Sequence, residues 1–103
     1  MATNMTTQEK TVSEVKIKIK PPSMYKVIIL NDNATPVEFV FGALLYVFHK
    51  ESKEALSIIE TAEREDKALV GVYTYDMAHT YVDKVKMVAK ENGYPLDFII
   101  EEE

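Results

Sequence analysis

The order of apolar and polar residues along the chain predicts three strands and three helices. Short runs rich in β-branched residues favour strands, whereas apolar residues three and four positions apart favour helices. The expected strands are residues 25–30, 68–74 and 96–100, and the expected helices begin near Thr35, Ser52 and Thr74. The order β-α-α-β-α-β leaves too few residues for repeated parallel crossovers. We therefore expect an α+β fold with a small three-stranded antiparallel sheet packed against three helices.

Two of the predicted helices begin with capping signals. In Thr35-Pro36-Val37-Glu38, we expect threonine as the N-cap, proline at the first helical position and glutamate at the third. The apolar stripe of this helix is expected to face the core with Phe39, Val40, Ala43, Leu44, Val47 and Phe48. Thr74 is expected to cap the last helix, which should stop at Asn92-Gly93. Gly71, inside the second strand, indicates a close backbone approach or a kink.

The two ends of the chain are polar. Residues 1–20 are rich in Thr and Lys and are expected to form a flexible tail, followed by one domain over residues 21–103. Val15 to Lys20 alternates apolar and basic residues at strand period, so an edge strand stays open as a second interpretation. Pro21-Pro22 blocks helix and separates tail from domain. Glu101 to Glu103 is expected to be a solvated end.

Composition and charge exclude several classes of protein. Acidic residues outnumber basic ones by 17 to 12, which gives a formal charge of −5 with histidine neutral. Nucleic acids and anionic membranes are therefore poor partners, and we expect neither. The chain has no cysteine, which removes disulfides, thiolate metal sites and thiol nucleophiles. Without a long apolar run or a signal-peptide core, the protein is expected to be cytoplasmic.

No residue pattern indicates catalysis or metal binding. His49 and His79 stand alone, each on a predicted helix, and no paired ligand spacing occurs. The three glycines are too far apart for a phosphate-binding loop, and no nucleophile elbow is present. The carboxylates from Glu60 to Asp66 form a charge run at a helix end, which is usually solvated. We expect a protein without a cofactor that is not an enzyme.

Asn31-Asp32-Asn33 lies between a predicted buried strand and a predicted helix. A loop held between rigid elements often carries function, and these side chains offer carboxylate and amide oxygens. Such oxygens suit a ligand that only donates hydrogen bonds, for example an ammonium group. The alternative is a turn that merely starts the helix, and from these residues alone both interpretations stay open.

The region around this loop closely resembles the opening of the ClpS family. From Lys20 to Val40 the sequence reads KPPSMYKVIILNDNATPVEFV. The family pattern there is Pro-Pro-x-x-Tyr-x-Val-x-x-x-Asn-Asp-Asp-x-Thr-Pro-x-Glu-Phe-Val. The resemblance runs without gaps to about Leu96 and includes Gly71-Val72-Tyr73-Thr74, Ala78, Thr80, Glu91-Asn92 and Pro95-Leu96.

The resemblance implies a monomeric adaptor for the AAA+ unfoldase ClpA with its peptidase ClpP, or for ClpC. Such adaptors bind N-degron proteins, whose free first residue is bulky, typically Leu, Phe, Tyr or Trp. By this resemblance Asn31 and Asp32 receive the α-amino group and first peptide unit, and the tail at residues 1–20 engages the unfoldase. The resemblance further implies a pocket lined or guarded by Thr35, Val37, Val40, Ala43, Ile59, Ala62 and Leu96.

The sequence departs from the family pattern at several implied site positions. Glu63 stands where the family has a histidine that bonds the α-amino group, so its carboxylate either attracts the ammonium or turns to solvent. Val37 replaces a methionine at the pocket rim, and Asn33 replaces a second aspartate. At the implied unfoldase contact, Ala34 replaces a bulky residue and Tyr81 a basic one, whereas Asp76 keeps the acidic character.

A second function remains open at this stage. A domain can keep its fold and dock on another partner, because fold alone does not decide function. The alternative is therefore a ClpS-fold docking module, or a modulator of a Clp unfoldase, that does not bind N-degrons.

Overall fold

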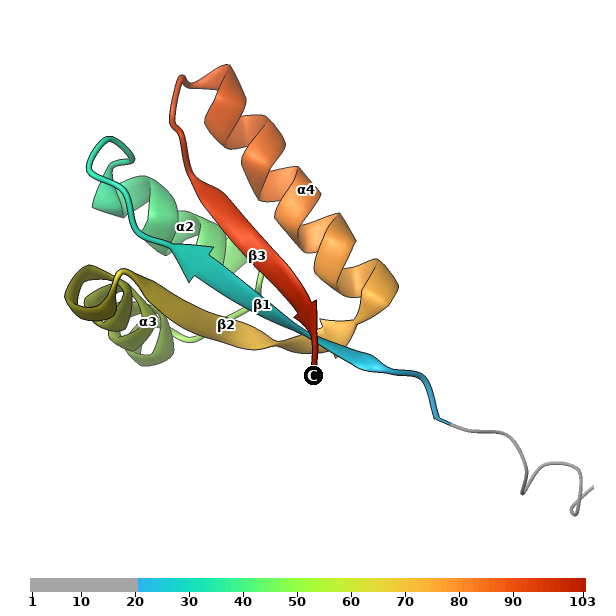
Figure 1. Cartoon of the computed structure of the whole chain (residues 1–103). Helices are drawn as coiled ribbons and strands as arrows, with labels where there is room; N and C mark the ends of the chain where they lie inside the picture. The colour runs from blue at the N-terminus through green and yellow to red at the C-terminus, as the bar shows by residue number, and fades with distance from the viewer. Residues whose placement is uncertain (1–20) are drawn as a thin grey trace, which may run out of the picture.

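The computed structural model describes residues 21–103 as one sheet with three helices (Figure 1). Its elements are β1 Met24–Leu30, α2 Val37–Tyr46, α3 Ser52–Glu65, β2 Lys67–Thr74, α4 Tyr75–Glu91 and β3 Asp97–Glu102. β1 is the central strand and pairs antiparallel with both β2 and β3. The expected element order and fold class are confirmed. The predicted tail at residues 1–20 lies outside the described residues.

Alternation along the strands separates a buried face from an open one. Val27 and Ile29 of β1 are 0% and 3% exposed, and both point to the helices. On the opposite face Ile28 pairs with Leu69 of β2 and with Ile99 of β3. Leu69 is 50% exposed and Ile99 is 39% exposed. One face of the sheet therefore packs against the helices, and no described element covers the other.

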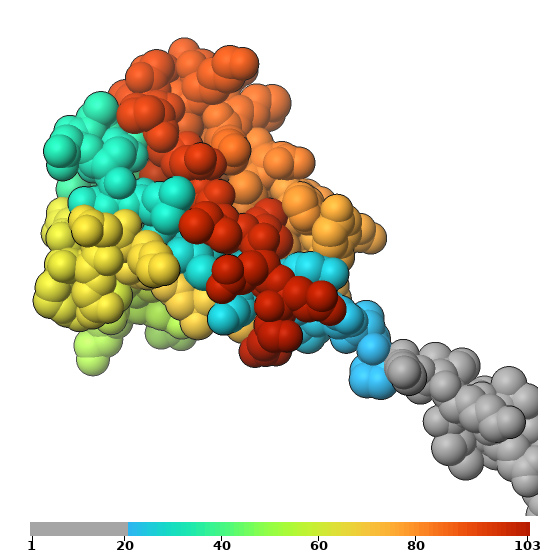
Figure 2. Space-filling view, in the orientation of Figure 1, coloured from blue at the N-terminus to red at the C-terminus, as the bar shows by residue number. Residues whose placement is uncertain are grey.

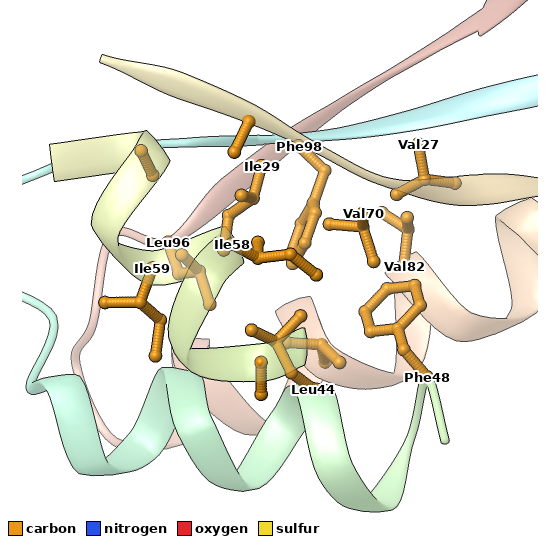
Figure 3. Packing of buried hydrophobic residues seen from close by; sticks show 14 of the residues in the cluster. Val27, Ile29, Leu44, Phe48, Ile58, Ile59, Val70, Val82, Leu96 and Phe98 are labelled. Atoms are coloured by element: carbon orange, nitrogen blue, oxygen red, sulfur yellow. The ribbon is translucent and has the colours of Figure 1, made fainter. Parts of the chain in front are cut away.

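A single apolar cluster joins the inner face of the sheet to all three helices (Figure 3). Leu44 of α2 and Val85 of α4 are almost fully buried in it, together with Ile58 of α3. No polar or charged side chain in residues 21–103 is buried. The described domain therefore has an apolar core, whose stability comes from burial. No helix within this part of the chain combines the length and apolarity needed to cross a bilayer.

The start and end of α2 differ from the expectation. The N-cap is Pro36, with no side-chain cap, because the hydroxyl of Thr35 donates backwards to Asp32. The predicted threonine N-cap is therefore wrong here. The helix ends at Tyr46, so Phe48 reaches the core from the turn that follows, and His49 lies beyond the helix at a φ of 59°.

The other element ends agree closely with the sequence. Thr74 caps α4 by accepting a hydrogen bond from the backbone N–H of Met77 at 3.4 Å. α4 stops at Glu91, just before Asn92-Gly93, and Gly93 adopts a φ of +75°. The final strand runs further than expected, because Glu101 and Glu102 belong to β3, although Glu101 to Glu103 are exposed to solvent as expected.

Gly71 coincides with the expected irregularity in β2. The β1–β2 register shifts between Val27 and Ile28, where Val27 pairs with Gly71 and Ile28 with Leu69. A Cβ at Gly71 would lie 2.8 Å from the hydroxyl of Tyr73 and 3.0 Å from the amine of Lys50. The missing side chain thus leaves room for these two groups beside a β-bulge.

We expect Leu44→Ala to lower the free energy of unfolding by about 2–5 kcal/mol, because it opens a cavity at a fully buried site. Leu56→Ala is the matched control, since Leu56 also lies on a helix but is 49% exposed. Its effect should stay below about 1 kcal/mol. Urea titration followed by circular dichroism measures both, and equal losses would contradict the assigned packing of α2.

Candidate functional site

A small cavity opens at the end of the domain where β1 finishes. In Figure 2 the loop after β1, in teal, and α3, in yellow, lie side by side at this end. The cavity has a volume of about 50 Å³. Its lining comes from β1, the following loop, α2, α3 and the segment before β3, and comprises Ile29, Leu30, Asn31, Asp32, Thr35, Val37, Val40, Ile59, Ala62, Glu63 and Leu96.

The carboxylate of Asp32 organises the loop at the cavity mouth. Its Oδ1 accepts hydrogen bonds from the backbone N–H groups of Ala34 at 2.8 Å and Thr35 at 2.7 Å. Its Oδ2 accepts one from the Thr35 hydroxyl at 2.9 Å. Each carboxylate oxygen has two lone pairs, so Oδ2 can accept one further donor.

These hydrogen bonds also keep the carboxylate charged. Partial burial acts to raise the pKa of Asp32, but the bonds from Thr35 and Ala34 outweigh it and hold the pKa below its ordinary value. Asp32 is therefore an anion at neutral pH. It lies at the mouth of a cavity with many apolar lining residues, which suits a ligand with a cationic and an apolar part.

A backbone hydrogen bond ties the two sides of the site together. The N–H of Asn31 donates to the carbonyl of Asp66 at 2.9 Å. Asp66 ends α3 in the left-handed region at a φ of 71°. This link holds the last turn of α3, which carries Glu63, against the end of β1. Glu63 therefore lines the same cavity and is exposed to solvent.

The structure brings most of the sequence-predicted site residues into one cavity. Those lining it are Asn31, Asp32, Thr35, Val37, Val40, Ile59, Ala62, Glu63 and Leu96. Two others do not line it. Asn33 is exposed on the loop, and Ala43 faces a different groove between α2 and α4. Sequence reasoning missed Ile29 and Leu30, although their place at the end of the strand that leads into the loop could have indicated them.

The three residues expected at an unfoldase contact do not form one patch. Ala34 follows the end of β1, whereas Asp76 lies beside its start, where Tyr25 packs on Tyr75 at 5.2 Å between ring centroids. Since β1 has seven residues, these ends are roughly 20 Å apart. Tyr81 is half-buried and packs edge-on against the ring of Phe48.

Comparison with known proteins identifies the family. The family model of the ATP-dependent Clp protease adaptor protein ClpS matches residues 20–99. The chain belongs to the ClpS family. A ClpS adapter of Nautilia profundicola is 43% identical over 93 residues, which cover 90% of this chain and 96% of the relative. A ClpS adapter of Burkholderia cenocepacia is 45% identical over 96 residues, or 92% of each chain.

A solved ClpS structure shares the fold. Agrobacterium tumefaciens ClpS2, bound to L-phenylalaninamide, superposes with a TM-score of 0.76 at 38% sequence identity. The match covers 81% of this chain and all of the ClpS2 chain.

Within residues 21–103 of this ClpS adaptor, no group of three or more His, Cys, Asp or Glu side chains is placed to hold a metal ion.

Asp32→Asn tests the role of the loop carboxylate in stability. At pH 7 we expect it to lower the free energy of unfolding by about 1 kcal/mol, a charged hydrogen-bond contribution reduced for solvent screening. Because the folded-state pKa of Asp32 is depressed, this stabilisation is complete above the ordinary value of 3.8 and is lost as the pH falls further. The difference in the free energy of unfolding between Asp32→Asn and the wild type should therefore shrink in acid.

Asp83→Asn is the control for this measurement, because Asp83 is an exposed aspartate on α4 far along the chain from the loop. Urea titrations of the three proteins at pH 7, 5 and 3.5 give the comparison. If the difference in free energy of unfolding between Asp32→Asn and the wild type persists unchanged at the lowest pH, the charge of Asp32 does not stabilise the loop.

Proposed function

We propose that this ClpS adaptor binds the free N-terminus of other proteins and hands them to a ClpA or ClpC unfoldase. The observation that carries the proposal is one cavity with apolar walls and two acidic residues, Asp32 and Glu63, in its lining. The α-ammonium of a protein N-terminus donates three hydrogen bonds and carries one positive charge. Asp32 Oδ2, the Asn31 side chain and Glu63 are the acceptors we assign to it.

The apolar walls receive the first side chain in this proposal. Burying a bulky apolar side chain contributes about 1.5–3 kcal/mol, which would supply much of the affinity. Thr35 supports the site indirectly, because its hydroxyl and N–H hold the Asp32 carboxylate in place. The phenylalaninamide bound to the related ClpS2 has a free amino group next to an apolar side chain, which is the same combination of groups.

The adaptor acts by binding alone in this proposal, without catalysis, and as a monomer. We assign the unfoldase contact to residues 1–20 together with Asp76, in the first turn of α4, and Tyr81, further along the same helix. Ala34, at the other end of β1, would then be a separate contact rather than part of the same patch. Because the Clp protease depends on ATP, we place the adaptor in the cytoplasm.

The experiment that tests this function is fluorescence anisotropy with labelled peptides that differ only at the first residue or its amine. Peptides with a free bulky first residue should bind, and N-acetylation should weaken binding at least about 100-fold, because it removes the charge and leaves buried acceptors unpaired. Equal binding of free and acetylated peptides, or no binding of either, would overturn the proposal in favour of a docking module.

Glu63→Gln examines the second carboxylate in the same assay. We expect the dissociation constant to rise about 3- to 10-fold at low salt, because a partly exposed ion pair is lost. Glu60→Gln is the matched control, since Glu60 is an exposed glutamate one turn earlier on α3 that does not line the cavity. An effect no larger than that of the control would show that Glu63 turns to solvent.

Binding should weaken as the pH rises above about 8. The free α-amino group has a pKa of about 7.7–8.0, and a bound ammonium near carboxylates has a higher one. Full affinity is therefore present below the pKa of the free amino group. It is lost as the pH rises through the higher pKa of the bound ammonium. Asp32 stays charged throughout this range, because its pKa is depressed. Titration by anisotropy from pH 6 to 10 measures this, and a flat profile would exclude ammonium recognition.

A further inference from the structure

Asp66 alone connects one wall of the cavity to the sheet. α3 ends at Glu65 and β2 begins at Lys67, so a single residue turns the chain from helix to strand. Asp66 makes this turn with a φ of 71° and a ψ of −10°, in the left-handed region. Residues other than glycine seldom adopt this region, although aspartate and asparagine do so more readily than most. The direction in which α3 meets the sheet therefore depends on the backbone of Asp66.

The same backbone conformation directs the carbonyl of Asp66 to the loop at the cavity mouth. This carbonyl accepts the hydrogen bond from the N–H of Asn31 at 2.9 Å. The bond lies one residue beyond the pair of Leu30 and Lys67, which ends the β1–β2 ladder. Because a peptide unit is planar, the direction of this carbonyl follows from the φ and ψ of Asp66. Another conformation at this residue would turn the carbonyl away from Asn31.

The residues on either side of this hydrogen bond line the same cavity, Asn31 at the end of β1 and Glu63 near the end of α3. The apolar core holds α3 as far as Ala62, which is 6% exposed. Residues 63–66 are exposed to solvent, so packing in the core does not hold them. The link from Asp66 to Asn31 is therefore what fixes the last turn of α3 beside the loop.

We propose that Asp66 is a positioning residue for the N-terminus site, and that the site needs its left-handed backbone rather than its carboxylate. This inference rests on the proposed function, because it concerns how the acceptors for the α-ammonium are held. The link from Asp66 keeps Asn31 and Glu63 close enough to accept hydrogen bonds from one ammonium group. Acceptors that are held in place before binding lose little conformational freedom when the ligand arrives.

The test uses substitutions of Asp66 that differ in how readily they adopt a positive φ. Fluorescence anisotropy with a free peptide that begins with leucine gives the Kd of each variant. Asp66→Asn and Asp66→Gly should stay within about twofold of the wild type, because both residues adopt the left-handed region readily. Asp66→Ala should raise the Kd about threefold, and Asp66→Val at least about tenfold, because a β-branched residue is disfavoured there. If Asp66→Val does not fold, the alanine variant decides.

His49 provides a matched control. Within residues 21–103 it is the other non-glycine residue with a positive φ, at 59°. It follows the end of α2, is exposed to solvent and does not line the cavity. His49→Val should therefore lower stability towards urea, as Asp66→Val does, but leave the Kd within about twofold of the wild type. Circular dichroism confirms that each variant is folded under the conditions of the binding assay.

Amide hydrogen exchange of the free protein measures the link itself. The N–H of Asn31 should exchange at least about tenfold faster in Asp66→Val than in the wild type, and at an unchanged rate in His49→Val. Equal peptide affinity of Asp66→Val and the wild type would overturn the positioning role and leave the proposed function intact. Asp66→Asn and Asp66→Gly variants as weak as Asp66→Val would also overturn it. Absence of binding by the wild type would overturn the proposed function, and this inference with it.

Discussion

The hydrogen bonds to the Asp32 carboxylate are the interaction on which the site depends. Three donors from Ala34 and Thr35 fold the loop after β1 around this side chain and keep it ionised. The two interpretations of Asn31-Asp32-Asn33, a turn that starts a helix and a ligand-binding loop, are therefore compatible. Oδ1 accepts two hydrogen bonds within the turn, whereas Oδ2 accepts one and has the capacity for another. One side chain thus shapes the loop and presents a charge at the cavity.

The core sets how rigidly that charge is presented. β1 ends directly in the loop, and Val27 and Ile29 fix it against all three helices through the shared apolar cluster. The Asn31–Asp66 bond then joins the loop to the end of α3, so the two carboxylate-bearing segments cannot separate without breaking it. Preorganised acceptors of this kind lose little conformational freedom on binding, which leaves more of the contact energy for affinity.

Much of the fold and site could be predicted from the sequence, and the failures have physical causes. The β-branched run of β1 and the Thr74 cap could be predicted from the sequence, because both depend on neighbours in the chain. Thr35 was mistaken for an N-cap because Asp32, three residues earlier, competes for its hydroxyl. Ala43 was expected at the pocket but lines the groove toward α4, because it lies about 120° around α2 from Val37. Such choices depend on which neighbour each helix face meets, and one sequence does not specify that.

The arrangement of the domain separates its two proposed contacts. The chain enters the described domain at the start of β1 and reaches the cavity at its end, roughly 20 Å away along the central strand. Asp76 and the first turn of α4 lie at the starting end, beside Tyr25. A bound N-terminus and an unfoldase that docks at Asp76 would therefore not compete for space (Figure 1), whereas a contact at Ala34 would lie next to the cavity. Both ends belong to one packed domain, so in the proposed function the domain itself keeps the site for the N-terminus away from Asp76.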